Sequence, residues 1–158
     1  QSLAMIGIAG PDWLTNTNLV MISIAILSIW WQLGYNMVIF LAGLQGIPKS
    51  YYEAAEIDGA TPFQRFRSIT LPMLSPTTFF VTIMAIISSF QVFDQAFVMT
   101  NGGPGKASYT MVYHIYNNAF VDFRFGASSA AAMILFMVIL IFTLIQFKLQ
   151  KRWVYYED

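Results

Sequence analysis

Three long stretches of this 158-residue chain contain no charged side chain, and they limit what it can fold into. They cover Leu19–Leu44, Ser68–Phe93 and Phe125–Phe147. Each exceeds the roughly 20 apolar residues that a helix needs to cross a bilayer. A core helix of a soluble protein shows a polar stripe, whereas MILFMVILIFTLI (Met133–Ile145) shows almost none. We therefore expect one all-α, polytopic membrane domain with spans at about 19–44, 70–95 and 125–147.

The composition disfavours several other classes of protein. Hydrophobic residues make up 57% of the chain and charged residues only 10%, whereas about a quarter of the residues in ordinary soluble domains are charged. The net charge is zero, so the charge balance does not favour nucleic acid as a partner. With no cysteine and a single histidine, His114, the sequence predicts neither disulfides nor a metal site. An intramembrane enzyme is disfavoured because no span interior holds Asp, Glu, His, Lys or Cys.

The distribution of lysine and arginine between the connections predicts the orientation of the chain. The tail before the first span has none, the loop after it has three, the next connection has two and the C-terminal tail has three. These residues are, in order, Lys49, Arg65 and Arg67, then Lys106 and Arg124, then Lys148, Lys151 and Arg152. We expect the N-terminus and the connection 100–124 to lie outside, and the loop 49–72 and the C-terminus to be cytoplasmic.

Two amides in the first span are candidates for lining a solute pathway. Gln32 and Asn36 are four residues apart and therefore share one face of a helix. Polar side chains at this depth either hydrogen-bond a neighbouring helix or face a wet cavity. Neutral amides also suit hydroxyl-rich neutral ligands, which they bind through many modest hydrogen bonds.

The second span carries a further group of polar candidates near its outer end. Ser88, Gln91 and Gln95 are three and four residues apart, which predicts one polar stripe with Asp94 beside it. This stripe would either hydrogen-bond the hydroxyls of a sugar or simply meet water at the end of the helix. At the other end of the span, Pro76 is expected to kink the helix.

The outer connection contains NGGPGKAS, Asn101–Ser108, which superficially has the composition of a phosphate loop. Such a loop needs a glycine five positions before its Gly-Lys pair and Ser or Thr directly after it. Thr100 and Ala107 occupy those two positions. We interpret the segment as tight turns leading to a short helix, Ser108–Phe120, on which His114 is structural because no second metal ligand lies near it in sequence.

The loop 49–72 is predicted to form two short helices, Tyr51–Ile57 and Pro62–Ile69. Ser50 and Glu53 fit a capping box for the first helix, and Thr61 and Gln64 fit one for the second. Between the helices, Gly59 can adopt the left-handed conformation that ends a helix. The first helix would project Glu53, Ala54, Ala55, Ile57 and Asp58 into the cytoplasm. It presents either a surface for a partner or a solvated loop in which Glu53 is merely a cap.

The same residues carry a family resemblance. Glu53-Ala54-Ala55, then Gly59 after three residues, then Ile69-x-Leu71-Pro72 after nine more, resembles the EAA loop of ABC importer permeases, with Asp58 before the glycine also matching. Other segments are similar to the maltose-type, sugar-importing branch of that family. They are Phe40–Ala60, Phe93–Gly105 and Phe125–Ile139.

This resemblance implies a transport subunit without catalysis or cofactors of its own. The EAA loop would dock on a cytoplasmic ATPase dimer that binds ATP and Mg²⁺, with Glu53 contacting a basic residue and Gly59 permitting the bend. A second permease subunit and an extracytoplasmic solute-binding protein would complete the assembly in the bacterial inner membrane. Such permeases have six or more spans, so we expect this chain to be a C-terminal part.

The resemblance implies a sugar or an oligosaccharide as the solute, with glycerol phosphate or another polyol as the alternative. A channel or a structural membrane subunit is a more distant alternative.

Overall fold

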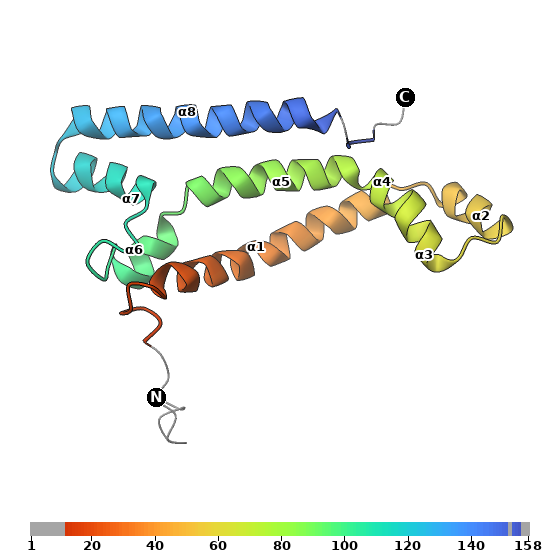
Figure 1. Ribbon diagram of the computed structural model, residues 1–158, viewed down its shortest axis with the longest axis horizontal. Helices are drawn as coiled ribbons and strands as arrows, with labels where there is room; N and C mark the ends of the chain where they lie inside the picture. Colours follow the sequence, from red (N-terminus) through yellow and green to blue (C-terminus); the bar gives the residue numbers. More distant parts are fainter. Residues whose placement is uncertain (1–11, 152, 156–158) are drawn as a thin grey trace, which may run out of the picture. The chain divides into compact units, whose positions relative to one another are not determined.

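The computed structural model describes residues 12–151 and 153–155, and every regular element in these residues is helical (Figure 1). The predicted all-α class is therefore confirmed. The elements are α1 (Val20–Gln45), α2 (Lys49–Ile57), α3 (Pro62–Arg65), the π-helical turn η2 (Phe66–Thr70), α4 (Leu71–Met73), α5 (Ser75–Phe90), α6 (Asp94–Thr100), α7 (Met111–Tyr116), the π-helical turn η3 (Asn117–Val121) and α8 (Phe125–Gln150).

Among the described residues, two helices, α1 and α8, are long and apolar enough to cross a membrane. An 18-residue stretch of each has a mean hydropathy of 1.6 in α1 and 2.6 in α8, and most of their apolar side chains are exposed. The segments Pro62–Met73 and Ser75–Phe90 form a third candidate span if this bent pair is counted as one. Apolar surface exposed at this scale is typical of helices that face lipid or other membrane helices.

The chain divides into two compact units. The first unit takes the described part of Gln1–Trp31 together with Phe90–Phe136, and so holds α6, α7 and the first halves of α1 and α8. The second takes Gln32–Ser89 with the described part of Met137–Asp158, and so holds α2 to α5 and the second halves of α1 and α8.

The core of the first unit joins α1 to the two short helices. Val20 and Ile24 on α1 pack against Ala96 on α6 and Tyr113 on α7, and all four side chains are buried. Half-buried residues from the connecting segments surround them, namely Val92, Phe93, Met99, Ala107 and Tyr109. This apolar cluster, together with rings stacked around Phe93, is what holds α6 and α7 in place.

In the second unit the helix that leads into α5 bends by 58°. Pro72 has no N–H and would clash with the carbonyl four residues before it in a regular helix. The π-helical turn η2 precedes this proline, and the Leu71 N–H donates to the Phe66 carbonyl five residues back. The break falls at Leu74 rather than at Pro76, which stands in the first turn of α5 where its missing N–H matters little.

The end of α5 differs from the prediction of one helix as far as residue 95. The helix ends at Phe90, and α6 starts separately at Asp94. The Thr110 hydroxyl donates to the Val92 carbonyl at 2.7 Å, which satisfies a backbone group left free by the break. Val92 and Phe93 meanwhile pack against the core of the first unit. Burial of these two side chains thus favours leaving the helix at this point.

The segment Asn101–Ser108 forms the tight turns that its glycines predict. Asn101 ends α6 in the left-handed conformation with φ of 49°, and its side chain accepts a hydrogen bond from the Tyr113 hydroxyl at 2.8 Å. Ser108 is fully buried and donates to the Gly103 carbonyl. The following helix begins at Met111 rather than at Ser108, because Thr110 is its N-cap and accepts from the Tyr113 N–H.

Candidate functional site

Helices α2 and α3 form a helical hairpin that contains the Glu-Ala-Ala sequence (Figure 1). We call the segment from Lys49 to Arg65 the coupling hairpin. The predicted capping box of Ser50 and Glu53 is wrong, because α2 begins two residues earlier than expected. Its N-cap is Pro48, an extended residue whose side chain makes no capping hydrogen bond. Ser50 therefore lies within the first turn, where its hydroxyl is no longer in the capping position.

The predicted capping box of Thr61 and Gln64 is confirmed. The Thr61 hydroxyl accepts from the Gln64 N–H, and the Gln64 side chain accepts from the Thr61 N–H at 2.7 Å. Pro62 follows as the first helical residue, with φ fixed near the helical value. The second helix runs on beyond its predicted end at Ile69, through η2 into α4.

The turn of the coupling hairpin is a Schellman motif centred on Gly59. The Gly59 N–H donates to the Glu56 carbonyl at 3.0 Å, and the Ala60 N–H donates to the Ala55 carbonyl at 2.9 Å. Gly59 has φ of +72°, a left-handed conformation that side chains with a Cβ disfavour. The space around it is open, so the backbone conformation alone calls for glycine at this position.

Two side-chain contacts connect α2 to the segment that follows the turn. Arg65 Nη1 lies 3.2 Å from Glu56 Oε2. The hydroxyls of Tyr52 and Thr70 are 2.9 Å apart, and Thr70 is buried. One contact lies near the turn and the other near the open end of the hairpin. Together with the capped helix ends, they make the hairpin a stiff unit rather than two independent helices.

The coupling hairpin leaves most of its predicted docking residues exposed. Glu53, Ala54, Asp58 and Gly59 are exposed and Ala55 is half-buried. Within residues 12–151 and 153–155 the Glu53 carboxylate has no hydrogen-bond or ion-pair partner. The interpretation of Glu53 as a cap of its own helix is therefore wrong. Glu53 stands five residues after Pro48, the N-cap of α2, and therefore beyond the positions that take part in capping.

The six candidate pathway residues are divided between the two units. Gln32, Asn36 and Ser88 belong to the second unit, and all three are half-buried. Gln91, Asp94 and Gln95 belong to the first. The predicted stripe of Ser88, Gln91 and Gln95 on one helix is wrong, because the break after Phe90 separates them. Gln91 is exposed in the linker between α5 and α6.

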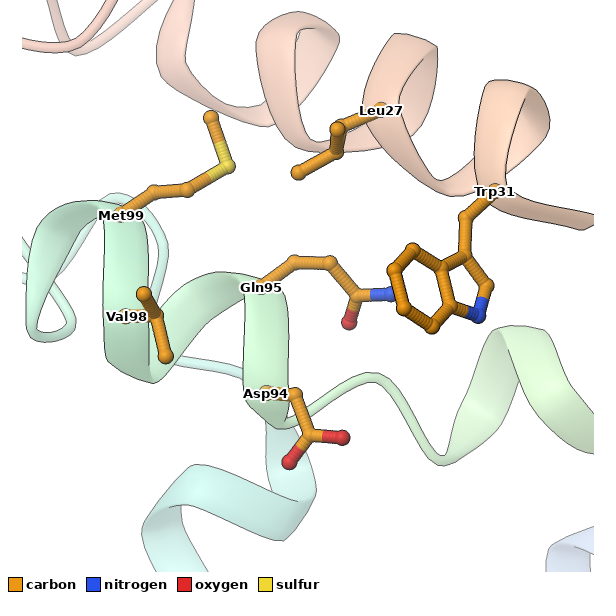
Figure 2. Close-up of a pocket in the computed structure, with 6 residues that line it drawn as sticks. All are labelled: Leu27, Trp31, Asp94, Gln95, Val98 and Met99. Atoms are coloured by element: carbon orange, nitrogen blue, oxygen red, sulfur yellow. The ribbon is translucent and has the colours of Figure 1, made fainter.

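Asp94 and Gln95 instead line a pocket within the first unit (Figure 2). The other lining residues are Leu27 and Trp31 from α1 and Val98 and Met99 from α6. Gln95 extends its amide toward the indole ring of Trp31 (Figure 2). Sequence reasoning placed Trp31 in the first span without assigning it to a site. Its position four residues after Leu27 was the available signal, since this spacing puts both on one helix face.

Long, apolar helices with mostly exposed side chains, together with an exposed, stiff hairpin, define an all-α protein embedded in a membrane. Residues 2–155 match the family described as "Binding-protein-dependent transport system inner membrane component", and the chain belongs to this family. It is accordingly a multi-pass protein of the inner membrane.

Several curated relatives are named as permease proteins. The chain is 40% identical over 146 residues to the sn-glycerol-3-phosphate transport system permease protein UgpA of Agrobacterium fabrum, a match that covers 92% of this chain and 50% of the relative. It is 42% identical over 148 residues to the probable ABC transporter permease protein YesP of Bacillus subtilis, covering 92% and 48%. The chain thus spans about half the length of the curated relatives that it matches.

The fold also matches a solved structure. A chain in the crystal structure of a bacterial ABC transporter involved in the import of the acidic polysaccharide alginate aligns with a TM-score of 0.81 at 24% identity. The match covers 96% of this chain and 53% of that one. At this level of identity the likeness establishes the fold.

Proposed function

We propose that this chain is part of the membrane-spanning subunit of an ATP-driven ABC importer that carries a sugar or an oligosaccharide. The observation that carries the proposal is the coupling hairpin. A stiff, capped hairpin with an unpaired carboxylate at Glu53 and an exposed Ala54 suits a surface that docks on a soluble partner and transmits its movement. In this proposal Glu53, Ala54, Ala55, Asp58 and Gly59 couple the membrane helices to a cytoplasmic ATPase.

The proposed assembly supplies the chemistry that this chain does not perform. A cytoplasmic ABC ATPase dimer would bind and hydrolyse ATP with Mg²⁺, and the permease chain would hold no cofactor. A second permease subunit would complete the pathway, and an extracytoplasmic solute-binding protein would deliver the solute. The family description, which names a binding-protein-dependent system, supports the last of these partners. The proposed orientation puts the coupling hairpin and the C-terminus in the cytoplasm, and the connection 100–124 outside.

The solute is proposed from the chemistry of the apolar helices. The ranges of α1 and α5 contain no lysine or arginine, and α8 has only Lys148, in its last turn. Neutral amides such as Gln32 and Asn36 suit hydroxyls better than they suit a phosphate dianion. The name of the UgpA relatives keeps glycerol phosphate as the second candidate. For that solute, cations would have to come from helices outside this chain.

The test of the proposed function uses the full-length permease co-expressed with its ATPase. Glu53→Lys and Gly59→Pro are expected to abolish co-purification of the ATPase and solute-dependent ATP hydrolysis. Glu53→Gln, which leaves the helix unperturbed, should weaken both. Lys106→Glu, an equal charge reversal in the outer connection, serves as the control and should keep both. Retention of the complex and of coupled hydrolysis in all hairpin variants would overturn the proposal, and ion flux without ATPase or binding protein would favour a channel.

A further inference from the structure

The pocket between α1 and α6 in the first unit has a volume of about 230 Å³. This is smaller than the roughly 300–1,000 Å³ of pockets that enclose drug-sized ligands. It therefore fits one ring-sized group rather than a whole oligosaccharide. The residues that form it are paired by helical spacing, because Leu27 and Trp31 lie one turn apart on α1, as do Gln95 and Met99 on α6.

The two sides of the pocket differ in chemistry. Leu27, Val98 and Met99 supply apolar surface, and Trp31, 73% exposed, supplies a broad aromatic face. Asp94 and Gln95 supply the polar groups, with the Gln95 amide directed toward the indole (Figure 2). Across the described chain Asp94 makes no ion pair or hydrogen bond through its carboxylate. Asp94 is exposed at the rim of the pocket, and an ionised carboxylate only accepts hydrogen bonds, so a ligand that contacts it there has to donate them.

We propose that this pocket binds one neutral, polyhydroxylated ring of the transported solute. The apolar face of the ring lies against the Trp31 indole. Its hydroxyls donate to the Asp94 carboxylate, and the Gln95 amide both donates to and accepts from neighbouring hydroxyls. The assignment rests on the proposed function and adds to it a particular contact residue, Trp31, and a particular chemistry for the ligand.

Other occupants match the pocket less well. A phosphate group would meet the negative charge of Asp94, with no cation among the six lining residues to offset it. A lipid acyl chain would match the apolar side but would leave the Asp94 carboxylate desolvated and unpaired, which is strongly unfavourable. A polyhydroxylated ring satisfies both sides, because it combines C–H surface with donors and acceptors.

Trp30 provides a matched control for Trp31. The two are neighbours on α1 and almost equally exposed, at 71% and 73%, but only Trp31 lines the pocket. Loss of the aromatic face is expected to raise the concentration for half-maximal uptake about tenfold in Trp31→Ala, which corresponds to one stacking contact. Trp31→Phe should recover most of this loss, and Trp30→Ala should behave as the parent does. Asp94→Asn should raise the same concentration, since an amide accepts fewer hydroxyl donors.

The assay reconstitutes the full-length permease, its ATPase and its binding protein in liposomes. Uptake is measured for labelled neutral mono- and disaccharides and for sn-glycerol 3-phosphate. Equal effects of Trp31→Ala and Trp30→Ala on a sugar that the parent carries would overturn the pocket assignment and leave the proposed importer intact. Preferred uptake of glycerol phosphate would overturn the neutral ligand. Absence of ATP-driven uptake of every compound by the parent would instead overturn the proposed function, and the pocket assignment with it.

Discussion

Arg65 Nη1 lies 3.2 Å from Glu56 Oε2, across the turn of the coupling hairpin. The arginine side chain is 24% exposed and the glutamate side chain 71% exposed, so water screens the pair. Pairs of this kind contribute about 0.2–1 kcal/mol. A double-mutant cycle of Glu56→Gln and Arg65→Gln should give a coupling energy in that range for the opening of the hairpin. Hydrogen exchange of the hairpin amides measures it.

The coupling energy should also fall as salt is raised from about 10 mM to 1 M, because the Debye length shortens from about 30 to 3 Å. A coupling energy of zero at low salt would show that Arg65 and Glu56 do not form an ion pair. A coupling energy that does not change with salt would show that water does not screen the pair.

Gly59 should be replaceable by asparagine at lower cost than by alanine. Its φ of +72° is left-handed, and no atom lies within 4 Å of where a Cβ would stand. Strain in the backbone rather than a clash therefore sets the penalty, which is about 1–2 kcal/mol for alanine. Asparagine tolerates this conformation and should lose roughly half as much. Thermal stability of the purified permease ranks the variants, and equal loss for both would point to a clash.

Gly43 permits a close approach of α1 to the start of α5 within the second unit. A Cβ at this position would lie 2.5 Å from Thr77 Oγ1 and 3.1 Å from Leu74 Cδ2. We expect Gly43→Ala to destabilise the protein by about 1–3 kcal/mol, as overpacking does. Gly34 on the same helix is the control, because a Cβ there meets nothing within 4 Å. Gly34→Ala should be neutral or stabilising by about 1 kcal/mol in the same thermal assay. A larger loss of stability in Gly34→Ala than in Gly43→Ala would contradict the close packing of Gly43 against α5.

Ser75 joins the C-terminal segment to the bend before α5. Its hydroxyl donates to the Pro72 carbonyl at 2.6 Å and accepts from the Tyr155 N–H at 2.8 Å, and the residue is buried. Ser75→Ala should cost about 1–3 kcal/mol because the Pro72 carbonyl and the Tyr155 N–H both lose their bond to the buried hydroxyl. The control is Ser89→Ala, since the exposed Ser89 hydroxyl bonds only to the Ile86 carbonyl of its own helix. Faster hydrogen exchange at Tyr155 in the first variant alone is the expected result.

Much of the fold follows from patterns that act over short distances. The apolar windows predict the two long helices to within a few residues, because length and hydropathy alone decide whether a segment can cross a bilayer. The Thr61 capping box and the turn at Gly59 were likewise predicted, since both depend only on neighbours within six residues. The Ser50 capping box was wrong because Pro48 was available as an earlier helix start.

The break after Phe90 depends on contacts that a linear pattern does not contain. The segment Ser75–Gln95 has a continuous apolar character, and its polar spacing fits a helix. What ends the helix is the Thr110 hydroxyl, 18 residues beyond Val92, together with the burial of Phe93 among Phe97 and Tyr116. The pocket at Trp31 was missed for the same reason. It exists only because α6 is a separate helix that packs against α1 within the first unit.

Helices α1 and α8 each contain 26 residues. At 1.5 Å per residue each is about 39 Å long, whereas the hydrocarbon core of a bilayer is about 30 Å thick. In a bilayer both helices must tilt or extend into the headgroup layer. The charged side chain of Lys148, in the last turn of α8, can then lie among the polar headgroups. Hydrophobic mismatch therefore acts on this protein, and the lipid chain length of the host membrane becomes a variable that influences how readily its helices rearrange.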